Sequence, residues 1–466
     1  LPGASTHGAR YADAAVGAGA VAVVTDEAGA ALTGDLRVPV IVVAGPRRSI
    51  GAWAAEVYGH PASRMQTYGI TGTNGKTTTM YLMESALTAA GRTVATIGTI
   101  GARVGAEVIR MSRTTVTTPE SPDLQALLAV MVERGADTVV MEVSSHALAM
   151  HRVDAMTFDV AGFTNLGWDH RDFHPSQEDY FEAKARLFAP GQSRSAVVAT
   201  DDAWGGKLAA RVRAAGMPLL TTGDGGDVRA TSVERLAGGS QRVAIDLGDH
   251  LLDVVLSLPG SHNVLNLVTA VAMLRAGGVV LEDAIGGFAD VAIPGRLERV
   301  DLGPDAPDVY VDFAHTPEAV EAALAALNDR RMVCVLGCGG DRDHFKRGPM
   351  GAVAVNGSDL LVVTDDNPRT EDPAGIREAV LEGAHRAKES AAPASRAAQC
   401  EVVDGGDRRH AIRRALAEAR PGDVVAVLGK GHERGQEMRG NVTEFNDAEV
   451  VREEWALLRE GAPTWS

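Results

Sequence analysis

Apolar residues in this chain gather in short runs that alternate with helical patterns. Residues 67–72, "TYGITG", are typical of a buried strand that ends in a glycine loop, and residues 76–91 have the spacing of an amphipathic helix that ends at Gly91. Further apolar runs, each closed by polar residues, follow at 93–101, 137–146, 158–167 and 193–202. This alternation predicts an α/β fold in which helices cover both faces of a mostly parallel sheet.

The pattern changes twice along the chain and predicts three domains, which also suits a length of 466 residues. Apolar runs at 20–29 and 38–45 predict a small N-terminal α/β domain over residues 1–63. The alternating region predicts a central domain over 64–294, and the glycine loop and the resemblance given below imply that it is a P-loop-type ATPase domain. A Pro-Gly turn then interrupts the alternation of strands and helices. Residues 295–466 are expected to form a Rossmann-like C-terminal domain with strands at 331–337, 359–367 and 423–431.

Composition narrows the classes of protein that fit. With 45% hydrophobic residues the chain is globular, and its formal charge of −16 makes it a poor general binder of nucleic acid. The three cysteines, Cys334, Cys338 and Cys400, suit core packing in a reducing compartment better than a disulfide framework or a metal site. No apolar run is long enough to insert into a membrane and no signal peptide is visible, so we expect a cytoplasmic protein. We also expect it to be a monomer.

The glycine loop at 69–79, "GITGTNGKTTT", is the first candidate for chemistry. Its glycines are offset from the usual phosphate-loop spacing, which would place a glycine where Ile70 stands. Even so, a strand, a glycine turn and a helix start supply the backbone N–H groups and the helix dipole that attract phosphate. Lys76 would reach the β- and γ-phosphates of ATP, and the Thr77 hydroxyl would hold Mg²⁺. An ordinary glycine turn with a solvated lysine is the alternative, and it fits the full motif poorly.

Polar residues after two further strands are candidate metal ligands. Glu142 ends the strand in 137–146, where an acidic partner for Mg²⁺ is expected, although an exposed glutamate would give the same pattern. The segment "NLGWDHRDFH" then places Asp169, His170, Asp172 and His174 after the next strand. These four residues are either a source of metal ligands or solvated residues of a turn.

Lys184 lies in an apolar helical face, within the segment "YFEAKARLF" at 180–188. A lysine in such a face is usually paired with a carboxylate one helical turn away. From composition alone, a salt bridge with Glu178 or Glu182 is therefore the favoured interpretation.

Three segments in the last third of the chain carry charged and glycine-rich residues just past their strands. They are "CGGDRD" at 338–343, "DDNPR" at 365–369 and "GKGHE" at 429–433. In an open parallel sheet, ligands bind outside the carboxyl ends of the strands. The three segments are therefore expected to face one crevice.

The order of these motifs resembles the Mur ligase family. Between Thr67 and Glu433 the chain carries, in order, "GTNGKTT", "TTPE", "EVSSHAL", "NLGWDHRDFH", "EAKARLF", "GSHNVLN", "PGRLE", "VDFAHTP", "GCGGDRD", "DNPR" and "GKGHE". The resemblance implies an ATP- and Mg²⁺-dependent ligase of peptidoglycan biosynthesis. It would add meso-2,6-diaminopimelate (meso-diaminopimelate) to the D-Glu γ-carboxylate of UDP-MurNAc-L-Ala-D-Glu through an acyl phosphate. The alternatives are a lysine-adding ligase of the same family, a folylpolyglutamate synthase-like ligase, and a P-loop ATPase or switch.

The resemblance also implies roles for single residues, with Lys76, His170 and Lys184 as the catalytic group. ATP would contact Gly72, Thr73, Asn74, Gly75, Lys76, Thr77, Thr78, Asn263, Arg296, Asp312 and His315. Metal ions would be held by Thr77, Glu142, His170 and an N-carboxylated Lys184. The muramoyl dipeptide would contact Thr117, Thr118, Ser144 and Arg152. The incoming amino acid would contact Arg342, Asp366, Asn367, Arg369, Gly429 and Glu433.

The chain departs from the family pattern in two places. Met150 stands where family members often have Gln, two residues before the matched Arg152. In the family, a strand with an Asp-Ser-Arg-like segment precedes "LPGASTHG", whereas this sequence begins at Leu1 without Met. We therefore expect one sugar or peptide contact to differ and part of the uracil pocket to be missing from the chain as given.

Overall fold

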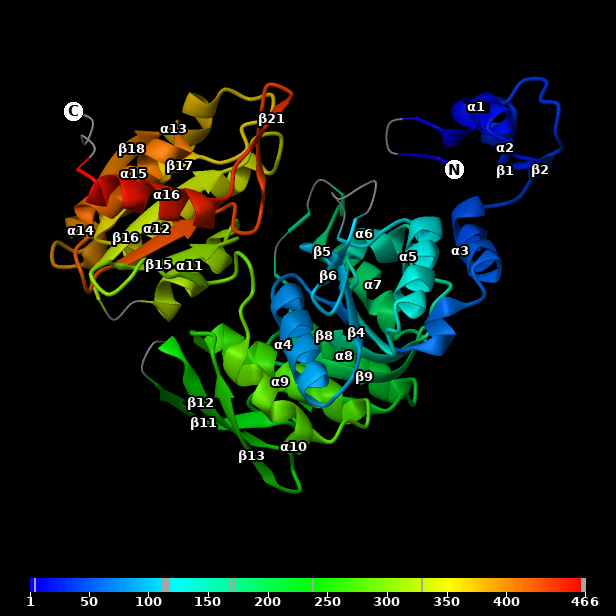
Figure 1. Ribbon diagram of the computed structural model, residues 1–466, viewed down its shortest axis with the longest axis horizontal. Helices are drawn as coiled ribbons and strands as arrows, with labels where there is room; N and C mark the ends of the chain where they lie inside the picture. The colour runs from blue at the N-terminus through cyan, green and yellow to red at the C-terminus, as the bar shows by residue number, and fades with distance from the viewer. Residues whose placement is uncertain are drawn as a thin grey trace.

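The computed structural model is a mixed α/β structure whose two large sheets are rich in parallel strands (Figure 1). It describes residues 1–3, 6–110, 117–167, 169–170, 173–236, 239–327 and 330–461. The α/β class expected from the sequence is confirmed. Within these ranges, no helix has the length and apolar character needed to cross a membrane.

A small parallel sheet of two strands begins the chain, in which β1 (Val23–Thr25) pairs with β2 (Val40–Val42). The Asp26 carboxylate caps the helix after β1 by accepting the Gly29 N–H at 2.8 Å. The helices here are η1 (Gly8–Tyr11), α1 (Ala12–Gly17), α2 (Glu27–Ala30), α3 (Pro46–Val57) and η2 (Pro61–Arg64). Figure 1 shows this blue region reaching the rest of the molecule through α3, which packs against α5 (Ser121–Glu133).

An eight-stranded sheet follows, with the strand order β10-β9-β8-β3-β7-β4-β5-β6. Its strands from β10 to β4 in that order run parallel, and β5 and β6 continue the sheet antiparallel. The strands are β3 (Gln66–Thr71), β4 (Val94–Gly98), β5 (Gly101–Val104), β6 (Glu107–Ile109), β7 (Thr138–Glu142), β8 (Phe158–Phe163), β9 (Ser193–Ala199) and β10 (Leu219–Thr222). β4 and β7 are buried along their whole length, as strands covered on both faces must be.

Two apolar cores cover the two faces of this sheet. Successive residues of β7 enter opposite cores, because side chains alternate along a strand: Val140 packs in one and Val139 in the other. The first core contains α4 (Lys76–Ala89) and α9 (Ser261–Ala276), and the second contains α5, α7 (Gln177–Ala185) and α8 (Ala203–Ala214). Shorter helices here are α6 (Ser145–Ala149), η3 (Arg186–Phe188), α10 (Leu281–Ala284) and η5 (Ile285–Asp290).

A three-stranded antiparallel sheet, which the sequence analysis did not predict, packs beside α9. It contains β11 (Arg229–Arg235), β12 (Gln241–Asp246) and β13 (Leu251–Leu256). Alternate residues of β13 are buried, and Leu252, Val254 and Leu256 join the core that contains α4 and α9. Because only one face is covered, these strands lack the continuous apolar runs that identified the others.

The last third of the chain forms a six-stranded sheet with the order β14-β15-β19-β16-β17-β18, antiparallel only at β14. The strands are β14 (Glu298–Val300), β15 (Asp308–Asp312), β16 (Met332–Cys338), β17 (Leu360–Asp365), β18 (Glu401–Gly406) and β19 (Val424–Leu428). The helices are α11 (Pro317–Ala326), η6 (His344–Lys346), α12 (Arg347–Gly357), α13 (Pro373–Ser390), α14 (Arg396–Gln399), α15 (Arg408–Glu418) and α16 (Asp447–Arg459), and a hairpin joins β20 (Gly435–Met438) to β21 (Asn441–Glu444).

The parallel register brings the motifs to common sheet edges. Strands β3 and β7 end at the glycine loop and at Glu142, and β16, β17 and β19 end at the three segments expected to share a crevice. Carboxyl ends of neighbouring parallel strands lie at one edge, so each set of motifs is gathered by the fold. The three cysteines are buried, as expected for core residues.

Candidate active site

The glycine loop at 72–75 joins β3 to the first turn of α4. Gly72 and Gly75 have φ angles of 148° and 85°, which L side chains rarely adopt. A Cβ on Gly72 would overlap Thr164, and a Cβ on Gly75 would overlap Asn266. A tight glycine turn therefore precedes a 14-residue helix, and the N–H groups of the first helical turn can bind phosphate.

Lys76, the first residue of α4, folds back over the loop. Its Nζ donates to the carbonyl oxygens of Gly72 at 2.9 Å and Thr73 at 2.8 Å. Burial lowers the pKa of Lys76, while Glu142 and Asp169 act in the opposite direction. The ammonium group therefore lies within the predicted phosphate loop and faces acidic neighbours.

The segment after β8 holds the loop in shape. Thr164 Oγ1 donates to the Asn74 carbonyl oxygen at 2.6 Å, and the Asn74 N–H donates to Asn165 Oδ1 at 2.9 Å. The Thr73 hydroxyl accepts the Gly167 N–H at 2.9 Å. Sequence analysis assigned no role to Thr164 or Asn165. Their position at the end of the strand next to β3 was the available signal.

Glu142 and Thr77, both predicted to hold Mg²⁺, meet beside the loop. Glu142 is fully buried, and its Oε1 accepts Thr77 Oγ1 at 2.9 Å. The carboxylate also accepts the N–H and the hydroxyl of Thr99, at 2.9 Å and 3.1 Å. Carboxylate and hydroxyl oxygens are suitable ligands for Mg²⁺, so these residues fit the ion. Thr78 lies next to Thr77 and is buried. Thr99, which bonds the Glu142 carboxylate, was not predicted from the sequence.

His170 lies among aromatic rings after β8. The centroid of its ring is 4.7 Å from that of His146 and 6.1 Å from that of Tyr180. Burial lowers the pKa of His170 to about 4, so the imidazole is neutral near pH 7 and keeps a lone pair for a metal. Among the residues that the structure describes, no three His, Cys, Asp or Glu side chains form a metal-binding group. Asp172, another predicted ligand, lies outside the described residues.

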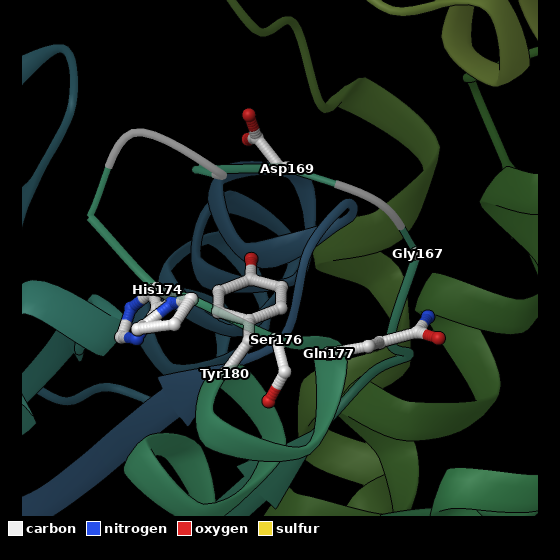
Figure 2. A pocket seen from close by; sticks show the side chains of 7 residues that line it. Gly167, Asp169, His174, Ser176, Gln177 and Tyr180 are labelled. Atoms are coloured by element: carbon white, nitrogen blue, oxygen red, sulfur yellow. The ribbon is translucent and has the colours of Figure 1, made fainter.

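A cavity of about 220 Å³ opens beside this cluster (Figure 2). In Figure 2 the Tyr180 ring stands within the cavity, and its hydroxyl points toward the segment that carries Asp169. The Thr73 hydroxyl lies 3.3 Å from the Tyr180 hydroxyl, which ties the cavity wall to the phosphate loop. His174, also a predicted ligand, is buried, and its Nε2 lies 2.9 Å from the Ser145 hydroxyl.

Lys184 is buried in α7 and does not form the salt bridge that composition favoured. Its Nζ donates to the Gly72 carbonyl oxygen at 2.7 Å and lies 4.3 Å from the centroid of the Tyr180 ring. Glu178 pairs instead with Lys207, and Glu182 pairs with Arg211. Burial, together with the charge of Lys76, lowers the pKa of Lys184 well below its usual value.

Asn263, predicted to contact adenine, lies at the start of α9. Its Nδ2 donates to the Pro259 carbonyl oxygen at 2.8 Å, and its Oδ1 accepts Asn266 Nδ2 at 3.1 Å. Asn266 in turn lies against Gly75 of the phosphate loop. Sequence analysis missed Asn266, although the i, i+3 spacing of the two asparagines in "GSHNVLN" was a usable signal.

Arg296, Asp312 and His315 surround Phe313 at the start of the C-terminal sheet. The Arg296 guanidinium lies 4.9 Å from the Phe313 ring centroid, and its buried Nε has no hydrogen-bond partner among the described residues. Burial raises the pKa of Asp312 to about 6 and lowers that of His315 to about 4. Burial raises the pKa of Asp169, but interactions with His170, His315 and Lys346 lower it overall. Asp169 of the central region and His315 of the C-terminal region are therefore near enough to interact electrostatically.

The predicted dipeptide contacts lie together next to Glu142. Thr118 Oγ1 donates to the Glu142 carbonyl oxygen at 2.9 Å and accepts the Ser144 N–H at 3.1 Å. Arg152 Nη1 donates to the Thr118 carbonyl oxygen at 2.9 Å. The Thr117 hydroxyl lies 3.3 Å from that of Thr99. These four predicted residues therefore gather in one hydrogen-bonded cluster beside Glu142, in which Thr118 is fully buried.

Arg152 also contacts Met150, the residue at which this chain departs from the family pattern. Its Nη2 donates to Glu120 Oε1 at 2.7 Å and lies 3.5 Å from Met150 Sδ. Glu120 is shared with Arg47 of α3, at 3.1 Å. The Met150 thioether thus occupies the position of the Gln often found in the family, whose amide could both donate and accept hydrogen bonds.

The predicted amino-acid contacts gather at the ends of β16, β17 and β19. Asn367 Nδ2 donates to Glu433 Oε2 at 2.7 Å. Gly429 has a φ of 116°, and a Cβ there would lie 2.6 Å from Asp366 Oδ2. Arg342 lies at the exposed rim of the loop after β16. The three segments therefore lie together at one edge of the sheet.

Arg369 has partners other than its sequence neighbours Glu371 and Asp372, the surface alternative considered for it. Its Nη1 donates to the Gly340 carbonyl oxygen at 2.6 Å, and its Nε lies 3.6 Å from Glu437 Oε2. Glu371 pairs with Arg347 at 2.8 Å instead. The guanidinium therefore turns into the crevice, toward β20.

Comparisons with known proteins agree with this geometry. Residues 70–274 match the Mur ligase middle domain, and residues 295–431 match the Mur ligase glutamate ligase domain. UDP-N-acetylmuramoyl-L-alanyl-D-glutamate--2,6-diaminopimelate ligase of Streptomyces coelicolor is 46% identical over 461 residues, covering 97% of this chain and 88% of the relative. The ligase of the same name from Corynebacterium glutamicum is 46% identical over 463 residues, covering 97% and 87%.

Solved structures give the same result. A structure of UDP-N-acetylmuramoyl-L-alanyl-D-glutamate--2,6-diaminopimelate ligase matches with a TM-score of 0.67 and 28% identity, covering 97% of this chain and 90% of that one. Folylpolyglutamate synthase of Mycobacterium tuberculosis, complexed with ADP, shares the fold with a TM-score of 0.65 at 20% identity, covering 83% and 92%. The resemblance seen in the motifs is confirmed: the chain belongs to the Mur ligase family.

Proposed function

We propose that this chain is an ATP-dependent ligase that joins meso-diaminopimelate to the D-Glu γ-carboxylate of UDP-MurNAc-L-Ala-D-Glu in peptidoglycan biosynthesis. Relatives that are 46% identical over 97% of the chain bear names that specify 2,6-diaminopimelate and this acceptor. The observation that carries the proposal in the structure is the contact between Asn367 and Glu433 at the strand ends, with the Arg369 guanidinium bonded to the Gly340 carbonyl oxygen beside them. A P-loop ATPase or switch would need no such amino-acid site.

The proposal includes a division of labour among three domains. Residues 1–63 would bind the UDP end of the acceptor, residues 64–294 would form the P-loop-type ATP-binding domain, and residues 295–466 would form the Rossmann-like amino-acid domain. The enzyme would act as a cytoplasmic monomer without nucleic acid. The electrostatic interaction between Asp169 and His315 supports a reaction centre between the second and third of these domains.

ATP would bind with its phosphates on the glycine loop. The N–H groups at the start of α4 and the Lys76 ammonium would hold the β- and γ-phosphates. Thr77, Glu142, His170 and an N-carboxylated Lys184 would hold Mg²⁺, which would offset the repulsion between ATP and the acceptor carboxylate. Arg296, whose buried Nε has no recorded partner, would meet the nucleotide from the C-terminal sheet.

The reaction would activate a carboxylate, which is a poor electrophile as an anion. The D-Glu γ-carboxylate oxygen attacks the γ-phosphorus of ATP, the bond to the bridging oxygen breaks, and ADP leaves. The neutral amine of diaminopimelate then attacks the acyl phosphate carbonyl carbon, and the C–O bond to phosphate breaks. Amide, inorganic phosphate and a proton are the products. Lys76 lies where negative charge develops on the transferring phosphoryl group.

A phosphate-release assay with the UDP-muramoyl dipeptide tests the proposal, with meso-, LL- and DD-diaminopimelate, L-lysine and glutamate compared in parallel. Phosphate release should require both the acceptor and meso-diaminopimelate. Lys76→Ala should abolish it while the circular dichroism spectrum stays that of the folded protein. ATP hydrolysis without the acceptor would support a switch, and preference for lysine or glutamate would support one of the other ligases.

A further inference from the structure

Lys430, in the "GKGHE" segment after β19, is completely buried beneath the proposed amino-acid site. Its Nζ lies 3.2 Å from Asn367 Oδ1, 3.2 Å from Glu433 Oε2 and 2.7 Å from the Gly435 carbonyl oxygen. A lysine ammonium carries three hydrogens, and these three acceptors engage all of them. Lys430 therefore has no donor left for a substrate.

The contact with Lys430 fixes the orientation of the Asn367 amide. The amide oxygen accepts both Lys430 Nζ and the Glu437 N–H, the latter at 2.9 Å. The amide nitrogen donates to Glu433 Oε2 at 2.7 Å. A flipped amide would set its NH₂ group against the lysine ammonium. In the orientation seen, one amide hydrogen has no recorded partner within the described part of the chain and can serve a ligand.

Glu433 is braced on one side and open on the other. Its Oε2 accepts both Asn367 and Lys430, whereas Oε1 has no hydrogen-bond partner among the residues that the structure describes. The Glu433 side chain is 32% exposed, while that of Lys430 is 0% exposed. The buried cation thus supports the carboxylate from within and leaves its outer oxygen to receive a cation from the crevice.

We propose that Lys430 is a positioning residue for the amino-acid substrate. It holds Asn367 and Glu433 in the geometry in which they meet the charged distal end of diaminopimelate, and it does so without touching the substrate. This inference deepens the proposed function and rests on it. A lysine that only stabilised the fold would affect the binding of ATP and of the amino acid alike, so the two kinetic constants separate the possibilities.

Lys430→Met tests the inference, because methionine fills a similar volume but carries no charge and no donor. The KM for meso-diaminopimelate should rise by about tenfold or more, since hydrogen bonds to charged groups are among the stronger ones, while the KM for ATP should change less than about twofold. Lys388→Met is the matched control. Lys388, on α13, donates to the main-chain carbonyl oxygen of Cys400, so the loss of its ammonium group should leave both KM values unchanged.

A double-mutant cycle shows whether Lys430 acts through Glu433. In a Glu433→Gln background, Lys430→Met should raise the diaminopimelate KM by less than about threefold, because the carboxylate it supports is already gone. Additive effects would overturn the inference, and so would an unchanged diaminopimelate KM or equal changes in both KM values. Turnover of the wild-type enzyme in the same assay tests the proposed function separately, and its absence would overturn both.

The pH profile gives a second readout. Burial raises the pKa of Glu433, Lys430 lowers it and Asp366 raises it, and Arg408 also interacts with this carboxylate. In Lys430→Met, the Lys430 charge is the only one of these that is lost, so the pKa of Glu433 should rise. The acid limb of kcat/KM for diaminopimelate should therefore move to higher pH. If Lys430→Met does not fold, Lys430→Gln keeps one donor group and should give an intermediate rise in KM. An unmoved acid limb or an unchanged KM in the variant that folds would overturn the inference.

Discussion

Lys184 Nζ donates to the Gly72 carbonyl oxygen at 2.7 Å, which ties helix α7 directly to the phosphate loop. The lysine is 1% exposed, and burial lowers its pKa well below the usual value, with Lys76 adding to the effect. An unperturbed lysine near pH 7.4 has only about one neutral amine in a thousand. The burial of Lys184 therefore supplies the neutral amine that reaction with CO₂ requires, at the point where a carbamate would face the loop.

We predict that Lys184 is N-carboxylated and that Lys184→Ala lowers ligation by about tenfold to a hundredfold or more, because a group that would help to hold Mg²⁺ is lost. Small carboxylic acids such as acetate should restore part of the activity. Lys207→Ala, which removes an exposed lysine paired with Glu178, is the control and should be nearly neutral. Electron density that shows a bare ammonium at Lys184 while Mg²⁺ is bound would contradict the prediction.

Gly75→Ala should weaken both folding and nucleotide binding. The φ of 85° at Gly75 costs an L residue about 1–2 kcal/mol, and the new methyl group would also displace Asn266 from the loop. Gly91 offers a matched control, because it has a φ of 79° but nothing within 4 Å of an added Cβ. Urea unfolding should show a loss in both variants. Calorimetric titration with a non-hydrolysable ATP analogue should show weaker binding only in Gly75→Ala, and equal affinities would argue against a nucleotide on this loop.

Stability should fall as the pH drops from about 7 to 5. Burial lowers the pKa of His262 to about 4 and, with nearby Arg296, that of His432 to about 3, whereas an unfolded histidine titrates near 6.5. Between these values the unfolded chain binds more protons, so stability rises with pH, by at most about 1.4 kcal/mol per pH unit for each histidine. The urea midpoint should therefore be lower near pH 5 than near pH 7.

Asp312 opposes this trend in part of the range. Burial raises its pKa to about 6, so between its unfolded value near 4 and that pH the folded state binds the extra proton, and the contribution is lost as pH rises. His170 and His315 have pKa values lowered to about 4 as well, so the histidines together outweigh Asp312. His262→Asn should flatten the pH dependence of the urea midpoint, and His250→Asn, at an exposed position, should not. A midpoint that is independent of pH would contradict the assignment of buried neutral histidines.

Much of the central sheet and its loop could be predicted from the sequence, because fully buried parallel strands are continuous apolar runs whose ends carry the polar motifs. The meeting of Thr77 with Glu142 follows because Thr77 lies in the first turn of α4 and Glu142 ends the strand next to β3. The β11–β13 sheet was missed because only one of its faces is buried. Polar and charged residues dominate β11, and Asp253 interrupts the apolar residues of β13, so no long continuous run stands out.

The partners that brace the candidate site could not be predicted in the same way. Lys430 lies inside a quoted motif, yet nothing in "GKGHE" shows that its side chain turns inward to Asn367, 63 positions away in the chain. The salt bridge expected between Lys184 and Glu178 or Glu182 failed for a related reason. Helical spacing gives the neighbours along one helix but not the burial of that face against the phosphate loop.

The last prediction concerns the choice of amino acid at Arg369. The turn that carries it is held by main-chain bonds to the β20–β21 hairpin: the Arg369 N–H donates to the Glu437 carbonyl oxygen at 2.9 Å, and the Arg439 N–H donates to the Arg369 carbonyl oxygen at 2.6 Å. Arg369 itself has a φ of 53°. The backbone is thus fixed, while the guanidinium is held by one carbonyl oxygen and by a partly exposed Glu437 carboxylate 3.6 Å away. A substrate carboxylate can replace so weak a partner and gain a bidentate contact.

Arg369→Ala should therefore raise the KM for meso-diaminopimelate steeply, by about a hundredfold, and leave the KM for ATP nearly unchanged, because hydrogen bonds to a charged group are lost only at the amino-acid site. The wild-type enzyme should reject L-lysine, which lacks the distal carboxylate and would leave the guanidinium desolvated without its partner. A site built around such a polar group discriminates by about 10⁴, and water entering the crevice would reduce the factor somewhat. Arg439→Ala is the control, since its exposed side chain lies on the hairpin that is bonded to the turn of Arg369. Steady-state kinetics with both amino acids decide the matter: wild-type use of lysine within about tenfold of diaminopimelate, or an unchanged preference in Arg369→Ala, would show that the specificity lies elsewhere.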